Sequence, residues 1–239
     1  MRRVYRDVAT RRTAGGYGIA LDGRAVRTPA KAELVVPGDA LAAAIAAEWN
    51  AQDPDILPAT MPLTRLAATA IDRTALQRDR VVVETANYAG TDLVCYRADR
   101  PPALAARQAT VWQPLMDWAA ERYDAPLTVT SGIVPTRQPA ASLNALAAAV
   151  AALDDFRLTA LHELTAACGS LVIALAVLDD RIDAAAAFAA AQLDETFQID
   201  AWGEDAEAAR RRHLLAADIA AAARFLELLD GRRPADRTA

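Results

Sequence analysis

Residues 16–37, GYGIALDGRAVRTPAKAELVVP, predict a small antiparallel sheet. Apolar side chains alternate over 17–21, which is typical of a strand. Asp22 and Gly23 come next and predict a tight hairpin turn, because both residues tolerate a positive φ. "RAVRT" and "ELVV" predict two further strands around a turn at 29–32, and "VYRDVATRR" predicts an earlier strand. So few strands form a meander that needs another element to pack against.

Helical patterns replace the strand pattern from residue 38 onward. Hydrophobic residues make up 54% of the 239-residue chain, and the excess is mostly alanine, the best helix former. The expected helices lie near 39–52, 63–74, 104–118, 139–153, 155–178, 182–202 and 204–230. The fold class is therefore α+β. We expect a small β-meander domain at 1–37 and a larger all-α helical domain at 38–239.

Composition and charge exclude several classes of partner. The net charge is −5 at pH 7 and the longest basic run is "ARRRH" at 209–213, so we expect no nucleic acid, because phosphate binding needs a positive surface. The apolar run at 171–178 is far below the ~20 residues that span a bilayer, so we expect a buried helix and no membrane insertion. Cys95 and Cys168 form no CxxC motif, which predicts buried thiols in a reducing compartment.

The usual catalytic and cofactor motifs are missing. "GGYG" at 15–18 is not the GxGxxG fingerprint, and the sequence has neither a GxxxxGK[ST] phosphate loop nor a GxSxG elbow. His162 and His213 are the only histidines, and they lack the spacing of a zinc-binding helix. We therefore expect no metal, no cofactor and no catalytic nucleophile.

Clustered carboxylates at 193–204, "LDETFQIDAWGE", are the strongest candidates for a functional site. On one continuous helix, Glu195 would share a face about 80° wide with four side chains: Phe188, Gln192, Ile199 and Trp202. Asp200 would point elsewhere and is expected to be a solvated charge. A carboxylate beside apolar groups needs a partner, because burying an unpaired charge costs several kcal/mol. Three interpretations of Glu195 remain open: an internal salt bridge, a contact with another protein, or a catalytic acid.

Six sequence blocks carry a resemblance to a known family. They are, in order, "YGIALDGRAVRTP", "EWNAQ", "MPLTRLAATAIDR", "TDLVCYRAD", "WQPLMDWA" and "LDETFQIDAWGEDAEA". The chain resembles, from about Tyr5 to about Leu229, the assembly chaperones that bind the α subunit of ATP synthase's soluble catalytic head.

That resemblance implies a function outside catalysis. Members of the family are non-enzymatic, with a small N-terminal β domain and a larger helical one. They hold free α subunits until these pair with β subunits. Mitochondrial members begin with a presequence, which is not visible here, so we expect a bacterial, cytoplasmic form. A monomer is the simpler expectation for a carrier of single subunits.

The resemblance also implies which residues bind the partner. The functional carboxylate of the family matches Glu195 or its neighbour Asp194, and the sensitive tryptophan of the "EW" block matches Trp49. With Gln198 and Trp202 these form the expected partner-binding set. For Trp49 a core position remains an alternative. Three acidic residues at 204, 205 and 207 are expected to stabilise the start of the next helix.

Two rival functions use the same residues differently. A small hydrolase or isomerase could use Glu195 as a general acid or base, which requires a concave site with a second titratable group beside it. A structural subunit of the finished ATP synthase would co-purify with it in stoichiometric amounts, whereas a chaperone would be absent from it.

Overall fold

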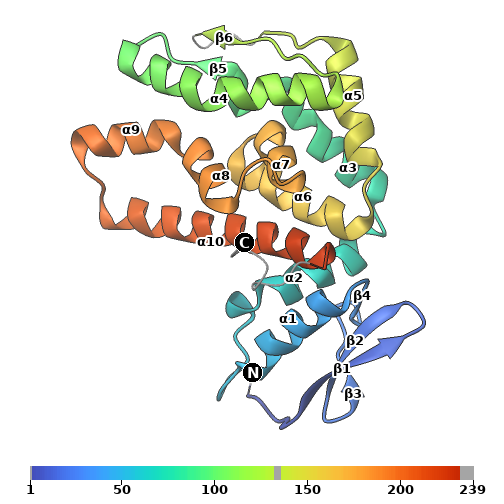
Figure 1. Ribbon diagram of the computed structural model, residues 1–239. Coiled ribbons are helices and arrows are strands. Elements are labelled where there is room, and N and C mark those ends of the chain that lie inside the picture. The colour runs from blue at the N-terminus through green and yellow to red at the C-terminus, as the bar shows by residue number, and fades with distance from the viewer. Residues whose placement is uncertain (1, 132–135, 232–239) are drawn as a thin grey trace. The chain divides into compact units, whose positions relative to one another are not determined.

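The computed structural model describes residues 2–131 and 136–231 of the chain (Figure 1). Its strands are β1 (Val8–Thr13), β2 (Gly16–Leu21), β3 (Arg24–Ala25), β4 (Val35–Val36), β5 (Tyr96–Arg97) and β6 (Thr130–Ser131). Its α-helices are α1 (Asp39–Asn50), α2 (Pro62–Thr69), α3 (Arg78–Ala86), α4 (Pro102–Tyr123), α5 (Ala140–Ala151), α6 (Asp155–Cys168), α7 (Leu171–Leu178), α8 (Ala184–Ala191), α9 (Leu193–Trp202) and α10 (Ala206–Leu229). The predicted α+β class is confirmed, because the N-terminal strands are succeeded by a mostly helical chain.

The predicted meander is present in β1, β2 and β3. β1 pairs antiparallel with β2 along its full length, and the turn to β3 uses positive φ at Asp22 (48°) and Gly23 (77°), as predicted. The last strand differs from a simple meander, because β4 returns to pair with β2 and not with β3. A backbone bridge between Arg27 and Glu33 closes the turn that sends the chain back.

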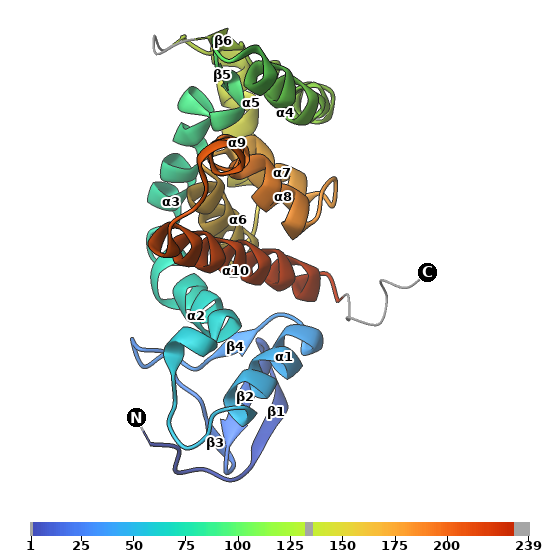
Figure 2. The ribbon, with the colours of Figure 1, turned by 90° about the vertical axis from the view of Figure 1, so that its left-hand side faces the viewer.

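Helix α1 supplies the packing partner that the sheet needs, and it lies against the sheet in both views (Figures 1 and 2). Ile19 of β2 and Leu41 and Ile45 of α1 are fully buried. Burying each such side chain stabilises the fold by roughly 1.5–3 kcal/mol.

The N-terminal segment binds the end of α1. The Arg3 guanidinium donates hydrogen bonds to the carbonyls of Asn50 (2.9 Å) and Gln52 (2.8 Å), and the Tyr5 hydroxyl donates to the carbonyl of Trp49 (2.7 Å). These carbonyls lie at or just beyond the last turn of α1, where helix carbonyls lack intrahelical donors.

Two carboxylates from the sequence blocks have structural roles. Glu48 accepts hydrogen bonds from the backbone N–H groups of Leu63 (2.7 Å) and Thr64 (2.8 Å), so it caps the start of α2. Asp72 accepts from the Thr28 hydroxyl (2.6 Å) and the Ala30 N–H (2.9 Å), which fixes the turn between β3 and β4.

The chain divides into two compact units, which are described separately. The first contains 1–78, 154–160 and 224–239, and the second contains 79–153 and 161–223. The first sheet, α1 and α2 belong to the first unit. α4, α5, α7, α8 and α9 belong to the second, together with a two-stranded parallel sheet of β5 and β6 that was not predicted.

Two helices predicted as continuous are broken. The segment 155–178 is divided at Gly169, which has a φ of +64°, and Ser170 caps α7 by accepting from the Ile173 N–H (3.0 Å). The segment 182–202 is divided at Gln192, which has φ −108° and ψ 27°. Apolar periodicity continues across both breaks, so the sequence pattern did not predict them.

α7 is the buried helix that its apolar sequence predicts. The carboxylate of Asp92, itself fully buried, accepts the Val172 N–H (3.0 Å) at the start of α7 and the Val94 N–H (3.2 Å) in its own loop. Burial raises the pKa of Asp92 to about 6, with its hydrogen bonds opposing that shift. Cys95 and Cys168 are buried, as predicted, and form no disulfide with each other; burial raises the pKa of both thiols to about 12. In the two described ranges, no helix combines the length and apolarity needed to span a bilayer.

Candidate functional site

α9 is fixed on one side by polar contacts with α4. The amide of Gln108, which is only 1% exposed, donates to the Asp194 carboxylate (2.7 Å), and its oxygen accepts from the Ala98 N–H (2.7 Å). Arg107 forms an ion pair with Asp200 (3.1 Å). Asp200 is exposed, as predicted, but it is paired and not simply solvated. Asp194 and Asp200 therefore both hold α9 to α4.

A short loop connects α9 to α10. Gly203 ends α9 with a φ of +82°, a conformation that favours glycine. Asp205 caps α10 by accepting from the N–H groups of Glu207 and Ala208 (2.9 Å each), and these bonds lower its pKa. The predicted role at the helix start is thus confirmed for Asp205, whereas Glu204 forms an ion pair with Arg212 (3.1 Å).

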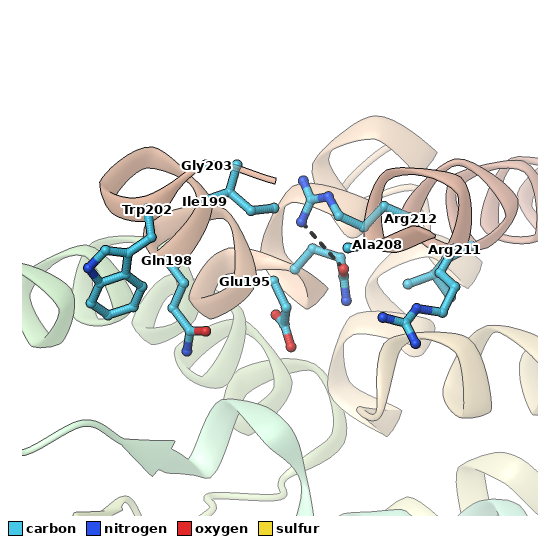
Figure 3. Close-up of a pocket in the computed structure, with 10 residues that line it drawn as sticks. Glu195, Gln198, Ile199, Trp202, Gly203, Ala208, Arg211 and Arg212 are labelled. Atoms are coloured by element: carbon cyan, nitrogen blue, oxygen red, sulfur yellow. Dashed lines mark hydrogen bonds between the residues drawn. The ribbon is translucent and has the colours of Figure 1, made fainter. Parts of the chain in front are cut away.

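Arg212 of α10 contacts side chains of α8, α9 and the loop between α9 and α10. Besides Glu204, its guanidinium donates to the Thr196 hydroxyl (3.2 Å) and the Gln192 amide oxygen (3.4 Å, dashed in Figure 3). It also lies 5.3 Å from the ring centroid of Phe188. Arg212 therefore joins α8, α9 and the loop to α10, using an ion pair, two hydrogen bonds and a cation–π contact.

These contacts leave a groove between α9 and α10, with a volume of about 420 Å³. This α9–α10 groove is lined by Gln192, Glu195, Gln198, Ile199, Trp202, Gly203, Ala208, Arg211, Arg212 and Leu215. The side chains of Glu195, Gln198 and Trp202 project from one side of α9, and Arg211 of α10 lies across from them (Figure 3). The groove combines charged, amide and apolar groups.

Glu195 is exposed and carries no hydrogen bond or ion pair to any described residue of the chain. The internal salt bridge is therefore not formed there. Glu195 shares the groove with Ile199 and Trp202, as its helical position predicts, but not with Phe188. The break at Gln192 places Phe188 on a separate helix, where it contacts Arg212.

Trp49 lies in the other compact unit. It is half-buried and packs against Tyr5, Ile56 and Met61. The Tyr5 and Trp49 rings meet edge to face, with centroids 6.0 Å apart. The structure therefore brings Glu195, Gln198 and Trp202 together, turns Asp194 toward Gln108, and places Trp49 beside a small core.

The groove offers binding groups and lacks an acid–base pair. Glu195 is the one carboxylate among the described residues that line it, the other ionisable lining groups are Arg211 and Arg212, and no histidine is among them. In the described ranges, no group of three His, Cys, Asp or Glu side chains could hold a metal ion. Ion pairing, amide hydrogen bonding and apolar contact are what this set of side chains can provide.

The α10 wall of the groove was missed from the sequence. Its residues are Ala208, Arg211, Arg212 and Leu215. The run "ARRRH" alone predicts no groove. The signal for this wall is the opposite charges of Glu207 and Arg211 four positions apart, which indicate an ion-paired helix surface.

Comparisons with known proteins agree with this description. Residues 2–120 match the family model described as ATP12 chaperone protein. The crystal structure of Atp12 from Paracoccus denitrificans is 46% identical, with a TM-score of 0.92 over 95% of this chain and 98% of that one. The Atu1473 protein of Agrobacterium tumefaciens is 38% identical, with a TM-score of 0.91 over 95% of this chain and 85% of that one. The mitochondrial protein atp12 of Schizosaccharomyces pombe is 25% identical over 86% of this chain and 75% of its own length.

Proposed function

The chain belongs to the ATP12 chaperone family, and from this premise we propose that it binds the free α subunit of ATP synthase's catalytic head. The chaperone covers part of the α-subunit surface that a β subunit later covers. It releases the α subunit when β binds. The family is one of chaperones, which agrees with the prediction that the protein is not an enzyme.

The observation that carries this proposal is the open α9–α10 groove. Trp202 is 80% exposed, although a large aromatic side chain is normally buried in a monomer or at an interface. Glu195 has no partner among the described residues and lies on the same side of α9. An aromatic side chain and an unpaired carboxylate in a groove form a surface suited to another protein.

The mechanism is differential shielding. An unassembled α subunit exposes an interface surface, and exposed apolar surface of that kind aggregates. The chaperone must bind α tightly enough to compete with self-association of α. Its affinity must also be low enough for the β subunit to displace it. Charged groups suit this balance because they contribute specificity and association rate more than raw affinity. Release is driven by β binding, so nucleotide hydrolysis by the chaperone is not required.

The proposal includes a location and a stoichiometry, and it disfavours the two rival functions. The protein acts in the bacterial cytoplasm, as a monomer carrying one α subunit. An enzymatic use of Glu195 is disfavoured because no second carboxylate and no histidine line the described groove. A permanent subunit is disfavoured because a shielding surface must be vacated when β arrives.

Co-expression with α alone, β alone and both subunits tests the proposal. We expect the tagged chain to keep α soluble and to retain it on affinity resin, to leave β unbound, and to lose α when β is present. A chain that retains β alone, or stays in the assembled enzyme at fixed stoichiometry, would contradict the proposal.

A matched pair of variants tests the site. Glu195→Lys should abolish suppression of α aggregation, measured by light scattering. Glu121→Lys reverses an exposed charge on α4, outside the groove, and it should reduce suppression much less. Equal suppression by wild type and Glu195→Lys would rule out this groove as the binding site.

A further inference from the structure

We propose that the α9–α10 groove recognises a client segment by a basic side chain and a bulky apolar side chain about 10 Å apart, the distance along α9 between Glu195 and Trp202. The basic group pairs with Glu195 and the apolar group packs on Trp202. This inference rests on the proposed function and specifies the chemistry of the segment bound.

Glu195 needs a cation from outside the groove wall. Both cations of the lining are engaged with other groups. Arg212 is bound to Glu204, Thr196 and Gln192 and lies over the Phe188 ring, and Arg211 pairs with Glu207. The Arg212 donors are directed into the wall and loop. The carboxylate of Glu195, on the open side, is left as an unmatched negative group.

Three groups stand in a fixed order along α9. Glu195, Gln198 and Trp202 occupy positions i, i+3 and i+7, which fall on one face of a helix. With a rise of 1.5 Å per residue, Gln198 lies about 4.5 Å and Trp202 about 10.5 Å along the axis from Glu195. The row therefore presents a carboxylate, an amide and an aromatic ring in sequence (Figure 3).

This row sets a requirement on the client segment. About 10 Å corresponds to three residues of extended chain or seven residues of helix. The Gln198 amide has both a donor and an acceptor, so it can bond a peptide group or a polar side chain between the two anchors. An arginine also fits the Glu195 end, because its guanidinium can engage both carboxylate oxygens.

The opposite wall limits how many basic residues the segment can carry. Arg211 pairs with Glu207 at 3.5 Å, and because both side chains are more than 70% exposed, the pair contributes little to stability. Arg211 lies across from Glu195 (Figure 3) and disfavours a second cation beside the first. A single basic residue next to neutral or acidic neighbours is thus preferred over a polybasic run.

The binding experiment uses whole α subunit co-purified with tagged variants of the full chain. Glu195→Gln and Trp202→Ala should each lower the retained α at least tenfold, and the Glu195 effect should shrink as salt rises. Two controls remove the same groups outside the groove: Glu121→Gln for the charge and Leu214→Ala for an exposed apolar side chain. Retention within twofold of wild type is expected for both controls.

Overlapping 15-residue peptides of the α subunit identify the segment. We expect the peptides that bind wild type to share one Arg or Lys with a bulky apolar residue three or seven positions away, and to lose binding to Glu195→Gln. Changing that basic residue to Glu should abolish binding to wild type and restore it with Glu195→Arg.

The outcomes separate the two proposals. If wild type retains α while Glu195→Gln and Trp202→Ala do so equally well, the groove inference is wrong and the chaperone function stands. Preferential binding of acidic or polybasic peptides would also overturn it. If wild type fails to retain or protect α, the proposed function itself fails.

Discussion

Three acidic residues within seven positions of α9 have different environments because a helix turns 100° per residue. Asp194 faces Gln108, Asp200 faces Arg107, and Glu195 faces the open groove. Helical phase predicted the separation of Glu195 from Asp200. The partners on α4 could not be predicted, because they lie more than 80 residues away in sequence.

Trp49 and Trp202 are expected to contribute differently to stability and to client binding. Trp49 packs against Tyr5 and a small buried cluster, whereas Trp202 is 80% exposed. Trp49→Ala should lower the free energy of unfolding by about 2–4 kcal/mol, toward the lower part of the range for buried aromatics because Trp49 is half-buried. Trp202→Ala should change it by less than about 0.5 kcal/mol.

Thermal and urea unfolding, with α-subunit retention assayed in parallel, check this contrast. The expected pattern is lost stability for Trp49→Ala and lost client binding with native stability for Trp202→Ala. If Trp49→Ala keeps its melting temperature but loses client binding, Trp49 is a contact and not part of the small core.

At the scale of elements, Asp92 joins a loop to the start of the most buried helix, α7. Its pKa is about 6 in the native protein because burial disfavours the charged form, against 3.8 as the ordinary value. Between these values the native state binds more protons than the unfolded state. The stability contributed by protonated Asp92 is therefore complete below about pH 4 and is lost as the pH rises through about 6.

Asp92→Asn, which cannot titrate, isolates this effect. The free energy of unfolding of wild type minus that of the variant should fall by roughly 2.5 kcal/mol between pH 4 and pH 7.5. The full effect, at 1.36 kcal/mol per pKa unit, is about 3 kcal/mol, and a small part of it is already lost at pH 4. Urea unfolding of both proteins at the two pH values measures the difference, and other titrating groups cancel. A difference that stays constant with pH would mean that Asp92 titrates alike in both states.

Sequence patterns predicted most elements but not where helices break. Strand alternation and Asp22-Gly23 indicated the first hairpin, and the apolar run at 171–178 indicated α7. Gly169 and Ser170 can break a helix, but apolar periodicity continues across them, so the sequence predicts one helix over 155–178. Gln192 carries no breaking signal at all. Its break depends on contacts made after folding, including the bond from Arg212 of α10.

At the scale of the molecule, the groove depends on how α8, α9 and α10 connect, because Arg212 binds groups from the first two of these and from the loop. The same cation that builds the wall is thereby prevented from neutralising Glu195. The second cation, Arg211, pairs with Glu207, so neither arginine of the groove forms an ion pair with Glu195 and the carboxylate remains available. The carboxylate could be predicted from the sequence, but the engagement of Arg212 required the fold.

For the whole chain, we predict the oligomeric state from the distribution of exposed apolar side chains. The large exposed apolar side chains come from different elements: Val4, Leu57, Leu76, Val83, Val129, Trp202 and Leu214. No single described element presents a continuous apolar face from this set, and stable dimers need a buried core of such residues. We therefore expect a 25.4 kDa monomer at micromolar concentration and a one-to-one complex with the α subunit.

Sedimentation velocity over a hundredfold range of concentration checks the monomer. The informative comparison is between wild type and Trp202→Ala, because a second copy is the competing occupant of the groove. If wild type dimerises and Trp202→Ala does not, the exposed tryptophan serves self-association, and binding of α must then displace a partner copy. If wild type and Trp202→Ala are both monomers, no second copy occupies the groove. A free α subunit can then bind without first displacing a partner copy.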